Sequence, residues 1–323
     1  MPRSEELSIR AGDANLAGTL VLPDGPPPAG RRERYPAALL LPSWLPRDRD
    51  GAYDRVGHPD WFAPGPVPPG LLARLAEALA ARGVASVRAD PRGCGRSDGA
   101  WEEVALFTKI DDARDMLAAM RSHRELDLRR TGIVGHGEGA GIALAVAIGD
   151  PAVSALTLIG ASARSWRDTL RRAAATRGRE GTDHEHPIVA TIDRWSEELI
   201  EHAERREATL TLQLSGGRQV TLALAPLEQA IRTPALALAT MLHRSVTLVH
   251  GVADAWSDPE ESQLLAAALE GAGEVPRLRW VAAAGHDLAE ADDRLIGEQA
   301  EDLATRLLPR DLPPVLVAIE EMG

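Results

Sequence analysis

One segment restricts the fold of this chain more than any other. Residues 131–134 form a short apolar run, residues 135–139 are Gly-His-Gly-Glu-Gly, and residues 140–148 are rich in alanine. The apolar run is typical of a buried strand, and the alanine-rich stretch is typical of a helix. Three glycines between them allow a sharp turn, because glycine adopts backbone conformations that other residues avoid. The segment therefore predicts a strand, a tight turn and a helix in immediate succession.

The same alternation of strand and helix patterns extends over most of the chain. Leucines at 71, 72, 75 and 79 form a helical stripe, and Gly83 is placed to end that helix before the next apolar run. Further helices are expected at 110–122, 140–148, 259–269 and 292–307, and strands at 7–10, 15–23, 37–41, 84–87, 131–134, 153–159, 246–249 and 278–282. This order predicts an α/β fold whose mostly parallel sheet carries helices on both faces.

The alternation stops between residues 163 and 233. An arginine-rich helical pattern is followed there by a second one at 188–206, and then by two alternating stretches at 209–214 and 219–224 that resemble a hairpin. We interpret residues 163–233 as an inserted lid subdomain. Residues 1–162 and 234–323 would together form the core domain.

Composition and charge narrow the range of partners. The net charge of −12 argues against nucleic acid or an anionic membrane as a partner. The single cysteine, Cys94, excludes a disulfide framework, and no apolar run approaches the length of about 18 residues that a membrane span needs. No secretory signal is visible at the N-terminus, so we expect a cytoplasmic protein. We also expect it to act on a small molecule and to need no cofactor. Homo-oligomerisation is left open by the sequence.

Five motifs in chain order resemble those of the α/β-hydrolase superfamily, in particular its prokaryotic peptidase- and thioesterase-like branch. They are Asp-Arg-Asp-Gly at 48–51, Asp-Pro-Arg-Gly-Cys-Gly-Arg-Ser at 90–97, the glycine-rich turn at 135–139, His-Gly-Val-Ala-Asp at 250–254 and Ala-Gly-His at 284–286. In that superfamily the turn that carries the nucleophile, called the nucleophile elbow, precedes the acid and the histidine in the chain. The motifs at 135–139, 250–254 and 284–286 follow the same order. The resemblance covers nearly all of the chain outside residues 163–233, and it implies an α/β-hydrolase fold.

The resemblance implies a histidine and an acid for catalysis. Asp254 and His286 stand where the acid and the base of a Ser-His-Asp triad stand, and the carboxylate would orient the imidazole. Asp258 and Asp287 are alternative acids. The other interpretation of a single histidine after a strand is that it is structural.

The chain departs from the family at the elbow, where Gly137 replaces the serine. Glycine has no oxygen that could attack a carbonyl, so this position cannot support acyl transfer. The loop before Asp48 also departs, because Pro-Ser-Trp-Leu-Pro at 42–46 replaces the family's His-Gly-Ser-Gly-Pro and sets Trp44 where a backbone N–H should meet an oxyanion. A single engineered substitution would not change both places, which favours a natural loss of the serine.

We therefore expect a serine-independent enzyme. His286, oriented by Asp254, would act as general acid and base on an apolar, carbonyl-bearing small molecule such as a natural-product intermediate. Elimination, isomerisation, cyclisation and water-mediated hydrolysis all remain open. One alternative is a non-catalytic protein that binds a ligand or a partner, and another is an esterase, thioesterase or peptidase whose serine was mutated to Gly137.

Several further residues are candidates for the same site. Glu138 begins the helix after the elbow and is either a third catalytic group or structural. Ser43, Trp44, His136 and Trp256 are assigned to the substrate pocket and the oxyanion loop. The cluster Asp-His-Glu-His at 183–186 looks like a metal site, but it lacks a third ligand group, so we interpret it as a solvated loop and expect no metal. Cys94 is expected to pack at the edge of the sheet.

Overall fold

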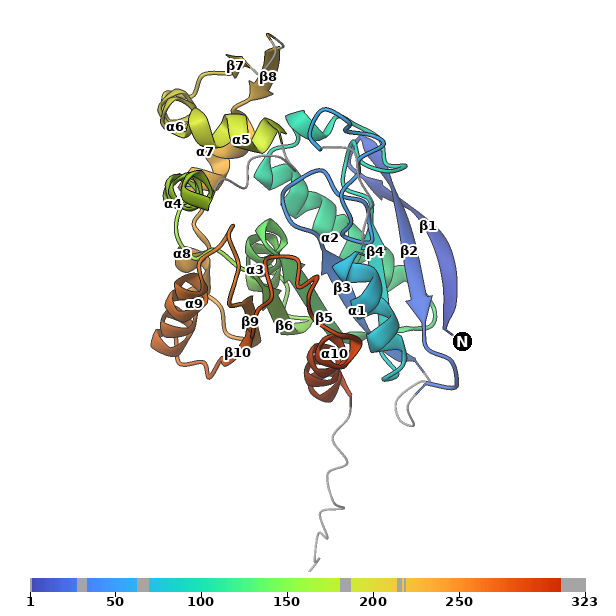
Figure 1. The fold of residues 1–323 in the computed structure, drawn as a ribbon. Helices are drawn as coiled ribbons and strands as arrows, with labels where there is room; N and C mark the ends of the chain where they lie inside the picture. The colour runs from blue at the N-terminus through green and yellow to red at the C-terminus, as the bar shows by residue number, and fades with distance from the viewer. Residues whose placement is uncertain are drawn as a thin grey trace, which may run out of the picture.

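An eight-stranded sheet forms the centre of the protein. The computed structural model describes residues 2–27, 34–62, 70–180, 187–213, 217 and 219–308. The strands follow the order β1-β2-β4-β3-β5-β6-β9-β10 (Figure 1). β1 and β2 pair antiparallel, as do β2 and β4, and the other neighbours are parallel. The strands are β1 (Arg3–Ala11), β2 (Ala14–Leu22), β3 (Tyr35–Leu41), β4 (Ala85–Ala89), β5 (Leu126–His136), β6 (Val153–Ile159), β9 (Ser245–Gly251) and β10 (Arg277–Val281).

Helices cover both faces of this sheet, which confirms the expected α/β-hydrolase architecture. On β3, Leu39 and Leu41 pack with the helices of one face, while Ala38 and Leu40 pack with those of the other. A strand buried on both sides has no polar face, which is why this strand is a continuous apolar run in the sequence. The first face carries α2 (Leu106–Ser122), α3 (Glu138–Gly149), α8 (Ala235–Ala239) and α9 (Pro259–Gly271); the second carries α1 (Leu71–Ala80) and α10 (Asp293–Leu307).

Helix ends were predicted less well than helices. α2 begins at Leu106 rather than at residue 110, and its N-cap Ala105 offers no side chain to accept a hydrogen bond. The usual start signal is therefore absent from the sequence. α9 and α10 do have such caps, Asp258 and Asp292, and their starts were placed within one residue. Among the described helices, none is both long enough and apolar enough to cross a membrane.

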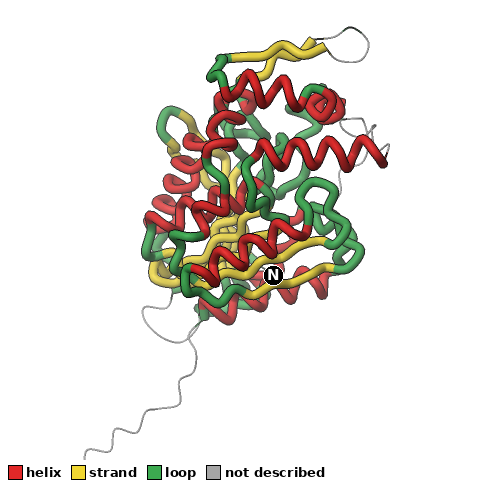
Figure 2. Tube along the Cα trace, turned by 90° about the vertical axis from the view of Figure 1, so that its left-hand side faces the viewer, coloured by secondary structure: helices red, strands yellow, loops and turns green. Residues whose placement is uncertain are grey.

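Between β6 and β9 the chain leaves the sheet. It forms α4 (Trp166–Glu180), α5 (Pro187–Arg194), α6 (Ser196–Glu204), the two strands β7 (Thr209–Gln213) and β8 (Gln219–Ala223), and α7 (Ala225–Arg232). These elements lie above the sheet in Figure 1, with the β7–β8 hairpin uppermost in Figure 2. Their apolar side chains form a third hydrophobic cluster, distinct from the two that flank the sheet. Trp61 and Phe62, from outside this segment, also belong to it.

The sequence predicts a single helix at 188–206 in this segment. The structure divides it at Trp195, whose φ of −106° and ψ of 22° are not helical. Neither proline nor glycine marks this break, so no local signal in the sequence predicts it. Part of the expected turn at 215–217 lies outside the described residues.

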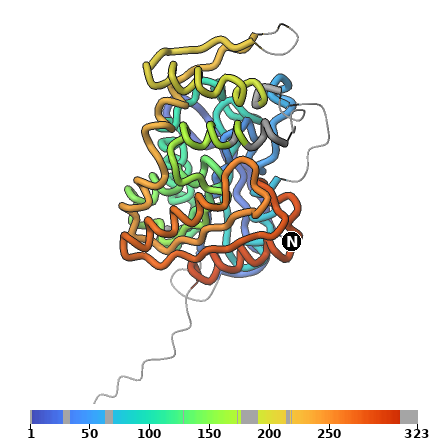
Figure 3. The backbone as a smooth tube through the Cα atoms, turned by 60° about the vertical axis from the view of Figure 1, so that its left-hand side comes forward, coloured from blue at the N-terminus to red at the C-terminus, as the bar shows by residue number. Residues whose placement is uncertain are grey.

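The carboxyl ends of the parallel strands meet below this segment. β3 and β5 are neighbours, and their register pairs Leu41 with Gly135. The residues two positions beyond each of these, Ser43 and Gly137, therefore leave the sheet side by side. In such sheets the crevice outside the strand ends is the usual place for a ligand. Figure 3 shows the helices of the inserted segment above this edge of the sheet.

Candidate active site

The turn from β5 into α3 has the geometry of a nucleophile elbow. Gly137 has a φ of 54° and a ψ of −115°, a conformation that is strained for a residue with a side chain. Gly139 is needed for space, since a Cβ atom there would come within 2.6 Å of the carbonyl oxygens of Leu41 and Pro42. The two glycines thus allow the turn to form and let α3 approach the loop after β3.

His286 and Asp254 meet below this turn. Asp254 follows β9, His286 follows β10, and the imidazole Nδ1 lies 2.8 Å from the carboxylate Oδ2. The other carboxylate oxygen accepts the backbone N–H groups of Trp256 and Ser257 at 2.8 and 2.9 Å. The expected contact is present, and two backbone N–H groups of its own loop hold the carboxylate in place. Nδ1 is therefore the donor to Asp254, which leaves Nε2 as the free acceptor of a neutral ring.

The surroundings favour a charged pair. Burial opposes the positive charge of His286, but the charge and the hydrogen bond of Asp254 outweigh it and raise the pKa of His286 above its usual value. Burial likewise opposes the negative charge of Asp254, and the charge of His286 together with several hydrogen bonds holds the pKa of Asp254 well below its usual range. Asp254 is thus ionised at neutral pH, and it stabilises a proton on the imidazole.

A serine hydroxyl faces the free nitrogen of His286. Ser43 Oγ lies 3.2 Å from His286 Nε2. A Cβ atom placed on Gly137 would lie 2.0 Å from the same Oγ and 2.9 Å from Nε2, so Ser43 fills the space of the missing elbow side chain. The sequence predicts Ser43 in the pocket lining and places the nucleophile position of the family at residue 137. No pattern within either segment predicts that β3 and β5 are neighbours, so this contact could not be found from the sequence.

A buried clamp ties the Ser43 loop to the His286 loop. Arg47 donates to Asp287 at 2.8 Å and to the carbonyl oxygen of Gly51 at 2.7 Å, and the Tyr53 hydroxyl donates to the other oxygen of Asp287 at 3.1 Å. Asp287 is the neighbour of His286 in the chain, so the clamp fixes the distance between the two loops. Asp287, one of the two alternative acids, is therefore bound to Arg47 and Tyr53.

The other alternative acid lies in a helix cap. Asp258 accepts the N–H of Glu260 at the start of α9 and pairs with Arg172. Its carboxylate is thereby committed to the helix terminus, and Asp254 holds the imidazole of His286.

The sequence predicts His136 in the pocket lining, but the structure places it in neither of the two cavities described below. It is fully buried, its ring centroid lies 4.6 Å from that of His286, and its Nε2 donates to the His286 carbonyl oxygen at 3.0 Å. Burial and the neighbouring charge of His286 lower the pKa of His136 to about 3. Residue 136 still belongs to β5, so its side chain points into the packed layer before the chain turns. The neutral ring of His136 thus packs against the imidazole of His286.

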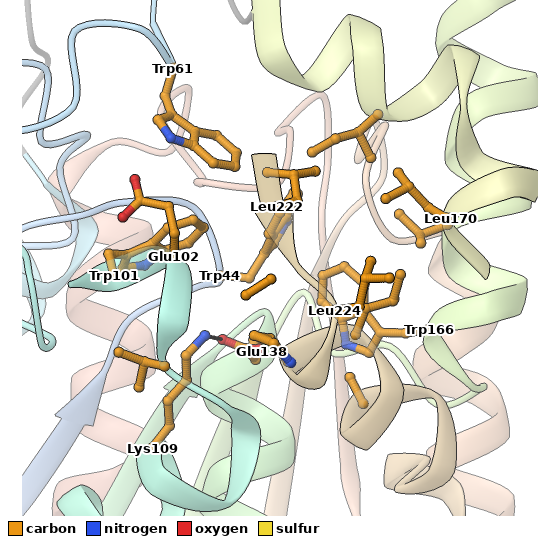
Figure 4. A pocket seen from close by; sticks show the side chains of 17 residues that line it. Trp44, Trp61, Trp101, Glu102, Lys109, Glu138, Trp166, Leu170, Leu222 and Leu224 are labelled. Atoms are coloured by element: carbon orange, nitrogen blue, oxygen red, sulfur yellow. Dashed lines mark hydrogen bonds and ion pairs between the residues drawn. The ribbon is translucent and has the colours of Figure 1, made fainter. Parts of the chain in front are cut away.

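An apolar chamber adjoins the strand ends. It encloses about 740 Å³ between protein atoms, part of it open to solvent (Figure 4). Trp44, Trp166 and Leu170 line both this space and a smaller cavity that contains Ser43, Gly137, Trp256 and His286. We call the larger space the tryptophan chamber; its walls include Trp44, Trp61, Trp101, Trp166, Leu170, Leu199, Leu222 and Leu224.

One ion pair lies in the wall of the tryptophan chamber. Lys109, the only lysine of the chain, donates to Glu138 at 2.7 Å and lies 5.6 Å from the ring centroid of Trp101. Both charged side chains are mostly buried. Figure 4 shows them pointing toward each other. Glu138 was proposed as either catalytic or structural, and the structure gives it this cation as its partner. The charged side chains in the lining of the chamber are thus this pair and Glu102.

A cluster of possible metal ligands lies where the loops after β3 and β4 meet. Asp54, His58 and Cys94 have ligand atoms within 4.8 Å of one another. Asp54 already accepts the N–H groups of Gly57 and Gly95, and burial raises the pKa of the Cys94 thiol far above its usual value. A protonated thiol and an occupied carboxylate suit packing rather than metal binding. The cluster at 183–186 lies outside the described residues.

Comparisons with known proteins agree with this architecture. A protein-family model described as serine aminopeptidase, S33, matches residues 69–292, while none of the curated proteins is detectably similar in sequence. Est1E from Butyrivibrio proteoclasticus with bound ferulic acid shares 15% identity at a TM-score of 0.63, over 93% of this chain and 98% of that one. The complex of DcsB with its substrate analogue shares 14% identity at a TM-score of 0.63, over 95% of this chain and 100% of that one. The α/β hydrolase GrgF from Penicillium sp. sh18 shares 16% identity at a TM-score of 0.60, over 95% of this chain and 99% of that one. At these identities the likeness shows the fold alone.

Proposed function

Because this chain belongs to the serine aminopeptidase, S33, family of α/β hydrolases, we propose that it is a hydrolase in which His286 is the general base and acid. The observation that carries the proposal is the 2.8 Å contact of His286 with Asp254, at a cavity that shares walls with the tryptophan chamber. Such a pair is the proton-transfer part of a hydrolase triad. Its substrate would be an apolar small molecule with an ester, thioester or amide carbonyl.

The electrostatics of the pair suit this role. A base must accept a proton in the transition state and then return it to the leaving group. Asp254 favours the protonated ring, so His286 can hold a proton transiently near neutral pH. Proton transfer of this kind contributes about 10²- to 10⁴-fold to a rate.

The tryptophan chamber supports the choice of an apolar substrate. Binding pockets for small molecules have volumes of about 300 to 1,000 Å³ and mostly apolar walls. Tryptophan rings line the chamber, and Trp44 packs edge-on against Trp166 with the ring centroids 5.2 Å apart. Such walls favour an aromatic or aliphatic body over a charged one.

A second candidate is proton transfer without a covalent intermediate. The side chain missing at Gly137 favours it, since the elbow itself carries no nucleophile. His286 would then drive an elimination, an isomerisation or a cyclisation at a carbon next to the carbonyl. The two candidates share His286 and differ in whether the enzyme becomes acylated.

The test is turnover of a panel of aryl and alkyl esters, thioesters and amides by the native chain, by His286→Ala and by His243→Ala. His243 is an exposed histidine paired with Glu274 and serves as the matched control. We expect hydrolysis that His286→Ala lowers by at least about 10²-fold and that His243→Ala leaves unchanged. Hydrolysis within tenfold of native in a folded His286→Ala variant would overturn the proposal. Binding of an apolar carbonyl compound without any turnover would favour a ligand-binding protein.

A further inference from the structure

We propose that Ser43 is the nucleophile of this enzyme, displaced from the elbow to the loop after the neighbouring strand. The inference rests on the proposed function of His286 and deepens it, because it names the reaction as acyl transfer to a serine hydroxyl. It replaces the expectation, drawn from Gly137, that no serine takes part.

The register of the sheet makes such a displacement geometrically simple. β3 and β5 run parallel, and Leu41 pairs with Gly135. Two residues further on, Ser43 and Gly137 occupy corresponding places at the same edge of the sheet. A hydroxyl can thus be delivered to His286 from either strand, since neighbouring strands lie about 4.8 Å apart.

The space beside His286 admits a hydroxyl from only one of the two positions. Ser43 Oγ lies 3.2 Å from Nε2, whereas a Cβ atom on Gly137 would lie 2.0 Å from that oxygen and 2.8 Å from Ser43 Cβ. Any side chain at 137 would therefore expel Ser43. Glycine at the elbow is what allows Ser43 to reach the imidazole.

The hydrogen bond runs in the direction that activates the serine. Nδ1 of His286 donates to Asp254, so Nε2 of the neutral ring accepts the hydroxyl proton of Ser43. The order of atoms is that of a Ser-His-Asp triad, which is recognised by geometry and not by sequence position.

Ser43 is held firmly and still faces the cavity. Its exposed fraction is 5%, and the clamp of Arg47 on Asp287 joins its loop to that of His286. It lines the same small cavity as His286, which shares walls with the tryptophan chamber. A carbonyl in this small cavity would therefore lie next to both the Ser43 hydroxyl and His286.

The start of α3 lies beside the reacting atoms. Gly139 in its first turn is packed against the carbonyl oxygens of Leu41 and Pro42, directly before Ser43. The positive end of a helix dipole stabilises negative charge near it. An oxyanion that forms when Ser43 attacks would lie close to this end.

The reaction would proceed through an acyl-Ser43 intermediate. Ser43 Oγ forms a bond to the carbonyl carbon while its proton passes to His286 Nε2, and the tetrahedral intermediate collapses as His286 protonates the departing alcohol, thiol or amine. Water then attacks the acyl-Ser43 ester and gives a proton to His286. Release of the carboxylic acid returns that proton to Ser43 Oγ.

The first test needs no native substrate. A fluorophosphonate probe reacts with an activated serine by losing fluoride, and peptide mass spectrometry locates the adduct. We expect one adduct per chain, on Ser43, and none in Ser43→Ala. Labelling of Ser86→Ala should equal that of the native chain, since Ser86 is a fully buried serine on β4 whose hydroxyl has no hydrogen-bond partner. No adduct, or an adduct on another residue, would overturn the proposal.

The second test separates this proposal from the proposed function. With the best ester of the panel, we expect folded Ser43→Ala to lose at least about 10³-fold in kcat, as loss of a triad serine does. If Ser43→Ala keeps its rate within tenfold while His286→Ala loses it, Ser43 is not the nucleophile and the role of His286 stands. If both variants keep the rate, the proposed function fails as well.

Discussion

Ser43 occupies the space into which a side chain of residue 137 would project. A Cβ atom on Gly137 would lie 2.0 Å from Ser43 Oγ, well inside the contact distance of two atoms. The two positions directly follow neighbouring strands, β3 and β5, and they compete for one place beside His286. The identity of residue 137 should therefore affect both the free energy of unfolding and the acylation of Ser43.

Gly137→Ser should damage the protein rather than repair it. The new side chain must displace Ser43, and we expect a loss of about 1–3 kcal/mol in the free energy of unfolding. Urea unfolding measures it. Gly141→Ala in α3 is the control: a Cβ atom there meets nothing within 4 Å, so this change should be neutral or stabilising.

A double variant should recover the stability that Gly137→Ser loses. Ser43→Gly combined with Gly137→Ser removes the clash, so we expect the free energy of unfolding to recover most of its loss and the fluorophosphonate adduct to move to residue 137. A double variant no more stable than Gly137→Ser alone would contradict a shared space.

The pH dependence of hydrolysis should reflect the raised pKa of His286. The ring must be neutral to accept a proton, so kcat/KM falls as pH drops through this pKa, and the acidic limb should lie above 6.5. Asp254→Asn removes the charge that raises the pKa, so the limb should move to lower pH while kcat falls by about 10⁴-fold. A limb that Asp254→Asn leaves in place would assign the titration to another group.

Asp287→Asn should loosen the clamp between the two loops. The buried guanidinium of Arg47 would lose its charged partner, which we expect to cost about 2 kcal/mol, less than for a fully buried pair because the Asp287 side chain is 29% exposed. Hydrolysis should fall, while labelling of Ser43 slows without moving elsewhere. Glu201→Gln, which removes an exposed ion pair with Arg205, should cost no more than about 0.5 kcal/mol.

Trp166→Ala should weaken binding of large apolar substrates. The ring lines both the tryptophan chamber and the small cavity, so its removal should raise KM by about tenfold to a hundredfold for aryl esters and much less for acetyl esters. Steady-state kinetics with both substrate types measures the difference. Trp280→Ala, at a half-exposed position on the edge strand β10, should leave both KM values unchanged. Equal effects on large and small esters would argue against the chamber as the substrate site.

Most of the fold could be predicted from the sequence, because its signals are local. The apolar run of β3, the leucine stripe of α1 and the glycine turn before α3 each identify their element from a few neighbouring residues. The division of the expected helix at Trp195 and the early start of α2 could not be predicted, because tertiary packing and not a local signal sets them.

The sequence by itself also determined that Asp254 and His286 follow strands near the end of the chain, and that position 137 has no nucleophile. Only the tertiary structure brought Ser43 to His286, committed Asp287 to Arg47, and buried His136 beneath the imidazole. The physical reason is the pairing of strands. Hydrogen bonds between β3 and β5 set side by side two residues that are distant in the chain, and no pattern within either segment states that register.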